Sequence, residues 1–211
     1  MISQRASTAA AAGRTRNRVS RAAPRAARGG GLAWLRDGSQ VQVRPVRRTD
    51  AGLLADGFAR LSTRSRQQRF LAPKSRLSAA ELRYLTDVDH YDHDAIGALD
   101  LAGAGVGIAR YIRSRRDPRS AEFAVTVVDA WQGRGLGTEL TRRLADRARH
   151  AGISTFTALV TADNAAVAGL LRTMRARLTG RDGATLEYEL ALLPDDGHDY
   201  GFGAVIGLGR I

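Results

Sequence analysis

The sequence predicts an α+β fold with a mixed, mostly antiparallel sheet of about six to seven strands, flanked by about four helices. Short apolar runs separated by turns predict strands. Apolar residues at helical spacing predict amphipathic helices. A glycine-rich turn joins one of these strands to one of these helices. With 211 residues, we expect one domain with tails: a disordered Arg- and Ala-rich extension (1–35), a folded domain (36–193) and a Gly-rich tail (194–211).

The front half of the domain predicts one strand, two helices and an antiparallel meander. Residues 40–46 alternate between apolar and polar side chains, as a half-buried strand does. Asp50 precedes a first helical pattern, and Ser78 precedes a second one with Glu81 at the capping-box spacing. Short turns separate the three strands that we expect next: 95–101, 105–113 and 121–128.

The back half alternates helices with strands. Leucines at 136, 140 and 144 form one apolar stripe with arginines between them, which predicts a helix of about four turns that ends near Gly152. A strand follows over 154–160. Asp163 or Asn164 then provides a helix N-cap, and the last strand covers 185–192.

Residues 132–138 form a glycine-rich turn between a strand and a helix. Glycines let a backbone approach a ligand closely, and a helix N-terminus favours phosphate groups. A P-loop needs a lysine here, and the only lysine in the chain is Lys74. The dinucleotide fingerprint fails as well, because Thr138 stands where its third glycine belongs.

The pattern of Gln132, Gly135 and Gly137 resembles the acetyl-CoA pyrophosphate loop of the GNAT acyltransferase superfamily. The order of elements around it is similar too, so the resemblance covers 41–193 and implies the GNAT fold. A narrower resemblance, in 65–89, is to bacterial protein-lysine acetyltransferases that acylate acyl-CoA synthetases.

The resemblance implies acetyl-CoA as cofactor, with CoA as product. Strand backbone over 125–127 would pair with the pantetheine arm, and Arg134 would meet an outer phosphate. Backbone N–H groups near Val127 would stabilise the oxyanion. The residues expected to bind the cofactor are Val125, Thr126, Val127, Gln132, Gly133, Arg134, Gly135, Leu136, Gly137, Thr138 and Asn164.

Glu122 is the candidate general base. A lysine amine has a pKa of about 10.4, so acyl transfer needs a group that removes its proton. Glu122 stands among apolar residues on the strand before the loop, where desolvation would raise its pKa; its position also matches the glutamate proposed as base in the lysine acetyltransferase branch. The alternative is a solvated carboxylate at a strand end. Leu171 stands where many GNAT enzymes carry a tyrosine as general acid, which also favours a mechanism led by glutamate.

The charge and composition of the chain limit which partners and which cellular location we expect. Residues 1–36 contain eight arginines and no acid, so they account for eight of the net charge of +12. This segment is a non-functional extension or mis-assigned start, a nucleic-acid-binding arm, or a transit peptide. The chain has no cysteine and no apolar run of membrane-spanning length, so we expect a cytoplasmic protein. His90 and His93 lie between carboxylates, but we expect no metal.

The leading hypothesis is therefore an acetyl-CoA-dependent N-acetyltransferase that acts on a primary amine, in particular a protein lysine such as one on an acyl-CoA synthetase. A second hypothesis is acetylation of a small amine, such as an antibiotic or polyamine. A third, ranked lower, is a non-catalytic nucleic-acid-binding protein that acts through its arginine-rich arm.

Overall fold

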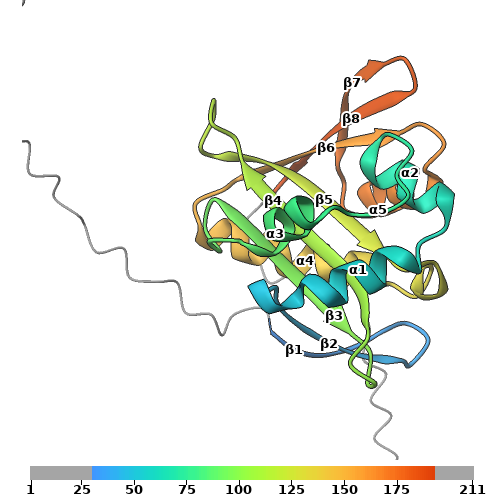
Figure 1. Ribbon diagram of the computed structural model, residues 1–211. Coiled ribbons are helices and arrows are strands. Elements are labelled where there is room, and N and C mark those ends of the chain that lie inside the picture. The colour runs from blue at the N-terminus through green and yellow to red at the C-terminus, as the bar shows by residue number, and fades with distance from the viewer. Residues whose placement is uncertain (1–29, 193–211) are drawn as a thin grey trace, which may run out of the picture.

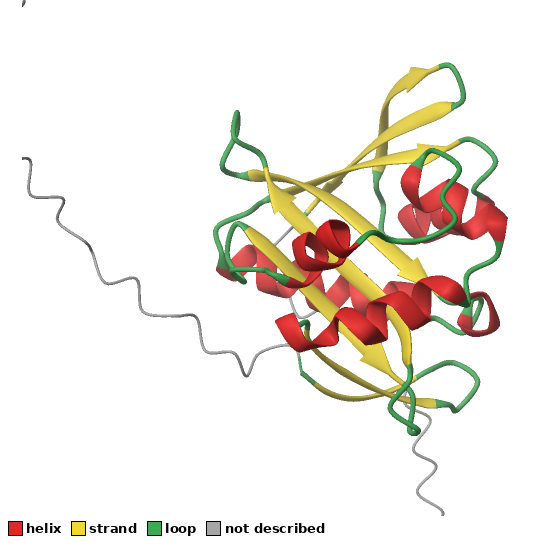
Figure 2. Cartoon of the chain, viewed as in Figure 1, coloured by secondary structure: helices red, strands yellow, loops and turns green. Residues whose placement is uncertain are grey.

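A computed structural model describes residues 30–192 and places them in one twisted sheet with helices on both faces (Figures 1 and 2). Within this part the sheet has eight strands in the order β1-β2-β3-β4-β5-β6-β8-β7. All neighbours are antiparallel except β5 and β6, which are parallel. The strands are β1 (Gly31–Trp34), β2 (Gln40–Pro45), β3 (His93–Leu99), β4 (Gly105–Arg113), β5 (Ser120–Val127), β6 (Thr155–Thr161), β7 (Arg177–Asp182) and β8 (Thr185–Ala191).

Helices α1 and α3 cover one face of the sheet, and α4 runs along the other face (Figure 1). The five α-helices of the described residues are α1 (Ala51–Ala59), α2 (Thr63–Phe70), α3 (Ala79–Thr86), α4 (Leu136–His150) and α5 (Ala165–Thr173). Two single turns of 3-10 helix, η1 (Arg48–Asp50) and η2 (Asp129–Trp131), precede α1 and the glycine-rich turn. None of these helices has the length and apolar character needed to cross a membrane.

The main core lies between the sheet and α4. The predicted leucine stripe of α4 is buried there, with Leu136, Leu140 and Leu144 at most 1% exposed. Phe123 of β5 and Phe156 of β6 stack with ring centroids 5.2 Å apart. This stack fixes β5 and β6 against each other where they pair, because rings in offset contact add to the free energy gained from burial.

The parallel pairing of β5 with β6 is short. It covers only three residue pairs, from Ser120 with Thr155 to Glu122 with Thr157. On its other side β5 stays paired with β4 as far as Val127. The second half of β5 therefore has one edge that is not paired with β6.

The structure confirms the predicted α+β class but has more elements than expected. Strand β1 lies within the segment assigned to the disordered extension, where it pairs with β2 along its whole length. Strand β7 is an edge strand whose residues are mostly exposed, so no apolar alternation marks it. Helix α2 contains few apolar residues; its visible signal is Ser62, whose side chain accepts a hydrogen bond from the N–H of Ser65. Residues 1–29, which we expected to be disordered, and the expected tail 194–211 lie outside the described residues.

Candidate active site

A cavity of about 620 Å³ lies where β5 and β6 separate. One wall is β5 from Glu122 to Val127, and the opposite wall is β6 and α5. The glycine-rich turn closes one end, and α2 lies over the cavity with Gln68, Arg69 and Phe70. The cavity therefore brings together segments from four separate parts of the chain.

The glycine-rich turn forms one end of the cavity and presents backbone N–H groups there. Gly133 and Gly135 have φ of 74° and 91°, a left-handed conformation that side chains other than glycine rarely adopt. Gly135 is the N-cap of α4 and contributes no side chain to the cap. The N–H groups of the first turn of α4 therefore stay available for an anion. Arg36 also lines this end of the cavity.

The unpaired edge of β5 runs along the cavity. The N–H of Val128 donates to Val106 of β4 over 3.0 Å. Because the N–H groups of successive strand residues point to opposite sides, the N–H of Val127 points away from β4, toward the cavity. The side-chain amide nitrogen of Gln132 donates to the backbone carbonyl of Val127 over 3.0 Å. Gln132 thus fastens the end of β5 to the turn.

Asp129 holds α2 in position over the cavity. Its carboxylate accepts hydrogen bonds from the Ser62 N–H (2.9 Å), the Ser62 hydroxyl (2.8 Å) and the Ser65 hydroxyl (2.9 Å). Burial raises the pKa of Asp129, but these hydrogen bonds from Ser62 and Ser65 outweigh it and hold the pKa below the usual value. Hydrogen bonds therefore hold the N-terminus of α2, and Phe70 at its C-terminus packs against the ring of Phe58 at 5.7 Å.

Most of the residues expected at the site line this cavity. The exceptions are Arg134 and Leu136. Leu136 is buried in the core. Arg134 forms an ion pair with Asp37 (3.1 Å) and lies over the ring of Trp131, a cavity residue, at 4.9 Å.

Helix α5 borders the cavity and begins at Asn164. The side-chain oxygen of Asn164 accepts a hydrogen bond from the N–H of Val167 over 3.1 Å, which confirms it as the N-cap. Leu171 is fully buried in the core, whereas Leu170 lines the cavity. Neither side chain has a proton to donate to a leaving thiolate.

Glu122 lies on the cavity wall at the point where the pairing with β6 ends. Its side chain is exposed, so the prediction that apolar neighbours desolvate it is wrong. The side chains of successive β5 residues point to opposite faces of the sheet, and the buried ones on either side of Glu122, Ala121 and Phe123, face α4. The register of β5 puts Glu122 on the opposite face, together with Ala124 and Thr126.

A second cavity, of about 90 Å³, adjoins the first on this face. The two share Arg69, Phe70 and Thr126 in their walls. The rest of the smaller cavity is mostly apolar and is formed by α1, α3 and β4. The hydroxyl oxygen of Thr126 is buried without a hydrogen-bond partner. The two cavities thus adjoin on the face of the sheet that carries Glu122.

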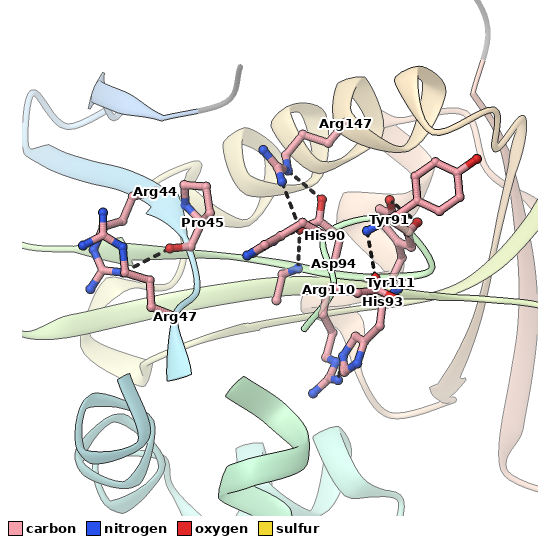
Figure 3. Close-up of polar contacts among 12 residues, drawn as sticks. Arg44, Pro45, Arg47, His90, Tyr91, His93, Asp94, Arg110, Tyr111 and Arg147 are labelled. Carbon is pink, nitrogen blue, oxygen red and sulfur yellow. Dashed lines mark hydrogen bonds and ion pairs between the residues drawn. The ribbon is translucent and has the colours of Figure 1, made fainter. Parts of the chain in front are cut away.

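Arg110 of β4 lines the smaller cavity, and the sequence interpretation missed it. It is 5% exposed and contacts the imidazole of His93 through one terminal nitrogen (Figure 3). Burial and the neighbouring charge of Arg69 outweigh the opposing effects of Tyr84 and Glu122, and together they lower the pKa of Arg110 to about 10. The available signal was Arg110 in the interior of the apolar strand 105–113, in addition to Arg113 at its end.

His90 and His93 point to different partners (Figure 3). His90 bonds the buried carboxylate of Asp94 over 2.7 Å, and Arg147 of α4 bonds the same carboxylate over 2.6 Å. Burial raises the pKa of Asp94, but the hydrogen bonds from His90 and Arg147 outweigh this effect and lower the pKa overall. This network ties β3 to α4. Among the residues described, no three His, Cys, Asp or Glu side chains gather as metal ligands.

Comparison with known proteins relates this architecture to one family. The family model for an acetyltransferase (GNAT) domain matches residues 40–177. The chain is 31% identical over 166 residues to acetyltransferase Pat of Mycolicibacterium smegmatis, covering 77% of the chain and 49% of that relative. It is 36% identical over 139 residues to an acetyltransferase of Pseudomonas aeruginosa, covering 64% of the chain and 74% of the relative. The chain thus spans about half the length of the first of these curated relatives.

A solved structure confirms the predicted GNAT fold. The GNAT domain of S. lividans PAT is 29% identical in sequence and superposes with a TM-score of 0.74. The match covers 78% of this chain and 98% of that domain.

Proposed function

The chain belongs to the GNAT family of acetyl-CoA-dependent N-acetyltransferases, and we propose that it transfers an acetyl group to the side-chain amine of a protein lysine, with Glu122 as general base. One observation carries this proposal. The glycine-rich turn, the unpaired edge of β5 and Glu122 line a single continuous cavity. A phosphate-binding end and a carboxylate thus stand at the two ends of one extended strand.

The cofactor would lie along β5. Its pyrophosphate would sit at the turn formed by Gly133 and Gly135 and at the first turn of α4. The pantetheine arm would pair with the open edge of β5 as an added strand. The N–H of Val127 faces the cavity and would bind the pantetheine arm, while a backbone N–H farther along the open edge of β5, toward Glu122, would donate to the thioester oxygen. One such donor in an oxyanion hole typically contributes about 2.7–4 kcal/mol to transition-state stabilisation.

The acceptor nitrogen attacks the carbonyl carbon of the thioester. Glu122 accepts one proton from the lysine ammonium, so that the nitrogen lone pair is free to form the new C–N bond, and the nitrogen releases its second proton to water as the C–S bond breaks. The C–S bond then breaks, and the electron pair leaves on the sulfur of CoA. Since Leu170 and Leu171 have no proton to give, the thiolate takes its proton from water or from the protonated carboxyl of Glu122. The products are an amide and CoA with a free thiol.

The exposed position of Glu122 supports a protein as acceptor. A carboxylate at the rim of a cavity is accessible to a lysine that projects from a folded protein surface. Binding of such a partner would also cover Glu122 and exclude water from the site of proton transfer. The relatives named Pat and the resemblance in 65–89 favour the same class of acceptor.

The test is acetyl transfer by the purified chain. Free thiol would be measured with acetyl-CoA and a proteome extract, and acetylated peptides would be identified by mass spectrometry. We expect Glu122→Gln to lower kcat by about 100- to 10,000-fold while the Kd for CoA is unchanged. Glu187→Gln, which changes an exposed glutamate on β8 outside the cavity, is the matched control. Failure to bind CoA at high concentration contradicts the proposal, and full activity of Glu122→Gln removes Glu122 as base.

A further inference from the structure

Arg110 is a buried cation with unused hydrogen-bonding capacity. Its Nε and one terminal nitrogen are buried and have no hydrogen-bond partner. Its guanidinium lies 5.3 Å from the ring centroid of Tyr84, and the other terminal nitrogen contacts His93. A buried charge that lacks an opposite charge and hydrogen bonds is costly. The free donors of Arg110 therefore point to an anion that binds there.

The groups around Arg110 do not neutralise it. Burial and the charge of Arg110 lower the pKa of His93 to about 4, so His93 is uncharged near pH 7. Arg69 adds a second positive charge. Among the residues that the structure describes, neither arginine forms an ion pair with a carboxylate. The site thus has two cations close to the single carboxylate of Glu122.

Arg110 and Glu122 lie on the same face of the sheet. Arg110 pairs with Ala124 across β4 and β5, and Glu122 is two residues before Ala124. Arg110 and Glu122 are therefore diagonal neighbours across the two strands, and residues in this relation are roughly 7–8 Å apart. Arg110 lines the smaller cavity, which shares Arg69, Phe70 and Thr126 with the wall of the larger one. A ligand that spans this shared wall would contact Glu122 with one group and Arg110 with another.

We propose that Arg110, assisted by Arg69, binds a carboxylate of the acceptor and so selects amines that carry a nearby acidic group. The proposal rests on the proposed acetyltransferase function. The carboxylate has two sources, an acidic side chain next to the acceptor lysine of a protein or the α-carboxylate of a free amino acid. The apolar wall of the smaller cavity suits an aliphatic part of either acceptor.

The experiment compares pairs of acceptors with and without this carboxylate. One pair is a lysine peptide with flanking Asp and the same peptide with flanking Asn. The other pair is leucine and leucinamide. The wild-type protein is expected to show a KM about 10- to 100-fold lower for the charged member of one pair, because hydrogen bonds to charged groups are of this strength. The pair that shows this difference identifies the source of the carboxylate. In Arg110→Gln the KM ratio should fall to about one, with the KM for acetyl-CoA unchanged. Arg83→Gln, which removes an exposed arginine of α3, should keep the wild-type ratio.

A wild-type KM ratio near one for both pairs overturns the proposal, and so does a ratio that survives in Arg110→Gln. If Arg110→Gln does not fold, competition in the wild-type protein decides. Butyrate should then inhibit competitively against the acceptor while butyramide does not; equal effects of the two compounds refute the carboxylate site.

Binding measurements separate this proposal from the proposed function. Calorimetry with CoA present would compare the same acceptor pairs without requiring turnover. A charge preference in binding without acetyl transfer contradicts the function and supports the carboxylate site. Acetyl transfer without a charge preference supports the function and contradicts the site.

Discussion

Gly135 offers a sharp test of the cofactor-binding turn. In Gly135→Ala the new side chain must adopt a φ of 91°, and its Cβ would lie 3.2 Å from Cγ of Arg36. A left-handed residue other than glycine costs roughly 1–2 kcal/mol. For a domain of this size, each kcal/mol lowers Tm by about 2–4 °C, so the expected loss is about 2–8 °C. Relief of this strain displaces the N–H groups at the start of α4.

The assay combines thermal unfolding with acetyl-CoA kinetics. We expect Gly135→Ala to raise the KM for acetyl-CoA by about 10-fold, which corresponds to about 1.4 kcal/mol. Gly152→Ala is the matched control, because Gly152 has a φ of 82° and no atom within 4 Å of an added Cβ. It lies at the opposite end of α4, so it should lose similar Tm while the KM stays unchanged.

Two results would refute the reasoning about Gly135. An unchanged Tm would show that the turn adopts the strained conformation without cost. An unchanged KM together with a lowered Tm would show that the turn does not contact the cofactor phosphates. An equal rise of KM in Gly152→Ala would instead assign the effect to the stability of α4.

Three further predictions concern buried polar groups. Asp94→Asn should lower the free energy of unfolding by about 3–5 kcal/mol in urea denaturation, because Arg147 stays buried without its anion; a loss under 1 kcal/mol contradicts this. The pKa of His93 is about 4 in the folded protein and about 6.5 when unfolded. Stability should therefore fall as pH drops from about 6.5 to 4, since only the unfolded chain binds this proton, and His93→Gln should flatten that dependence; equal slopes in both proteins contradict it. Thr126→Val should leave stability unchanged or raise it by about 1 kcal/mol, because the hydroxyl is buried without a partner; a large loss would reveal a hidden partner.

Local patterns predicted much of the fold. The capping box of Ser78 and Glu81 forms in the structure, with a 2.8 Å bond from the Ser78 N–H to Glu81. Strand β4 has the predicted bounds, 105–113. Such elements depend on residues a few positions apart, whose spacing is visible in the chain itself. Strand β7 escaped prediction because only its pairing with β8 defines it.

The sequence by itself determined the glycine-rich turn and the helix that follows it, because glycine conformations and a leucine stripe are local properties. It also determined the presence of a carboxylate ahead of that turn. Only the tertiary structure decided that β5 and β6 separate after Glu122, that this carboxylate is exposed, and that Arg110 is buried beside it. Those features depend on the register between strands that are distant in the chain, which side-chain periodicity alone does not specify.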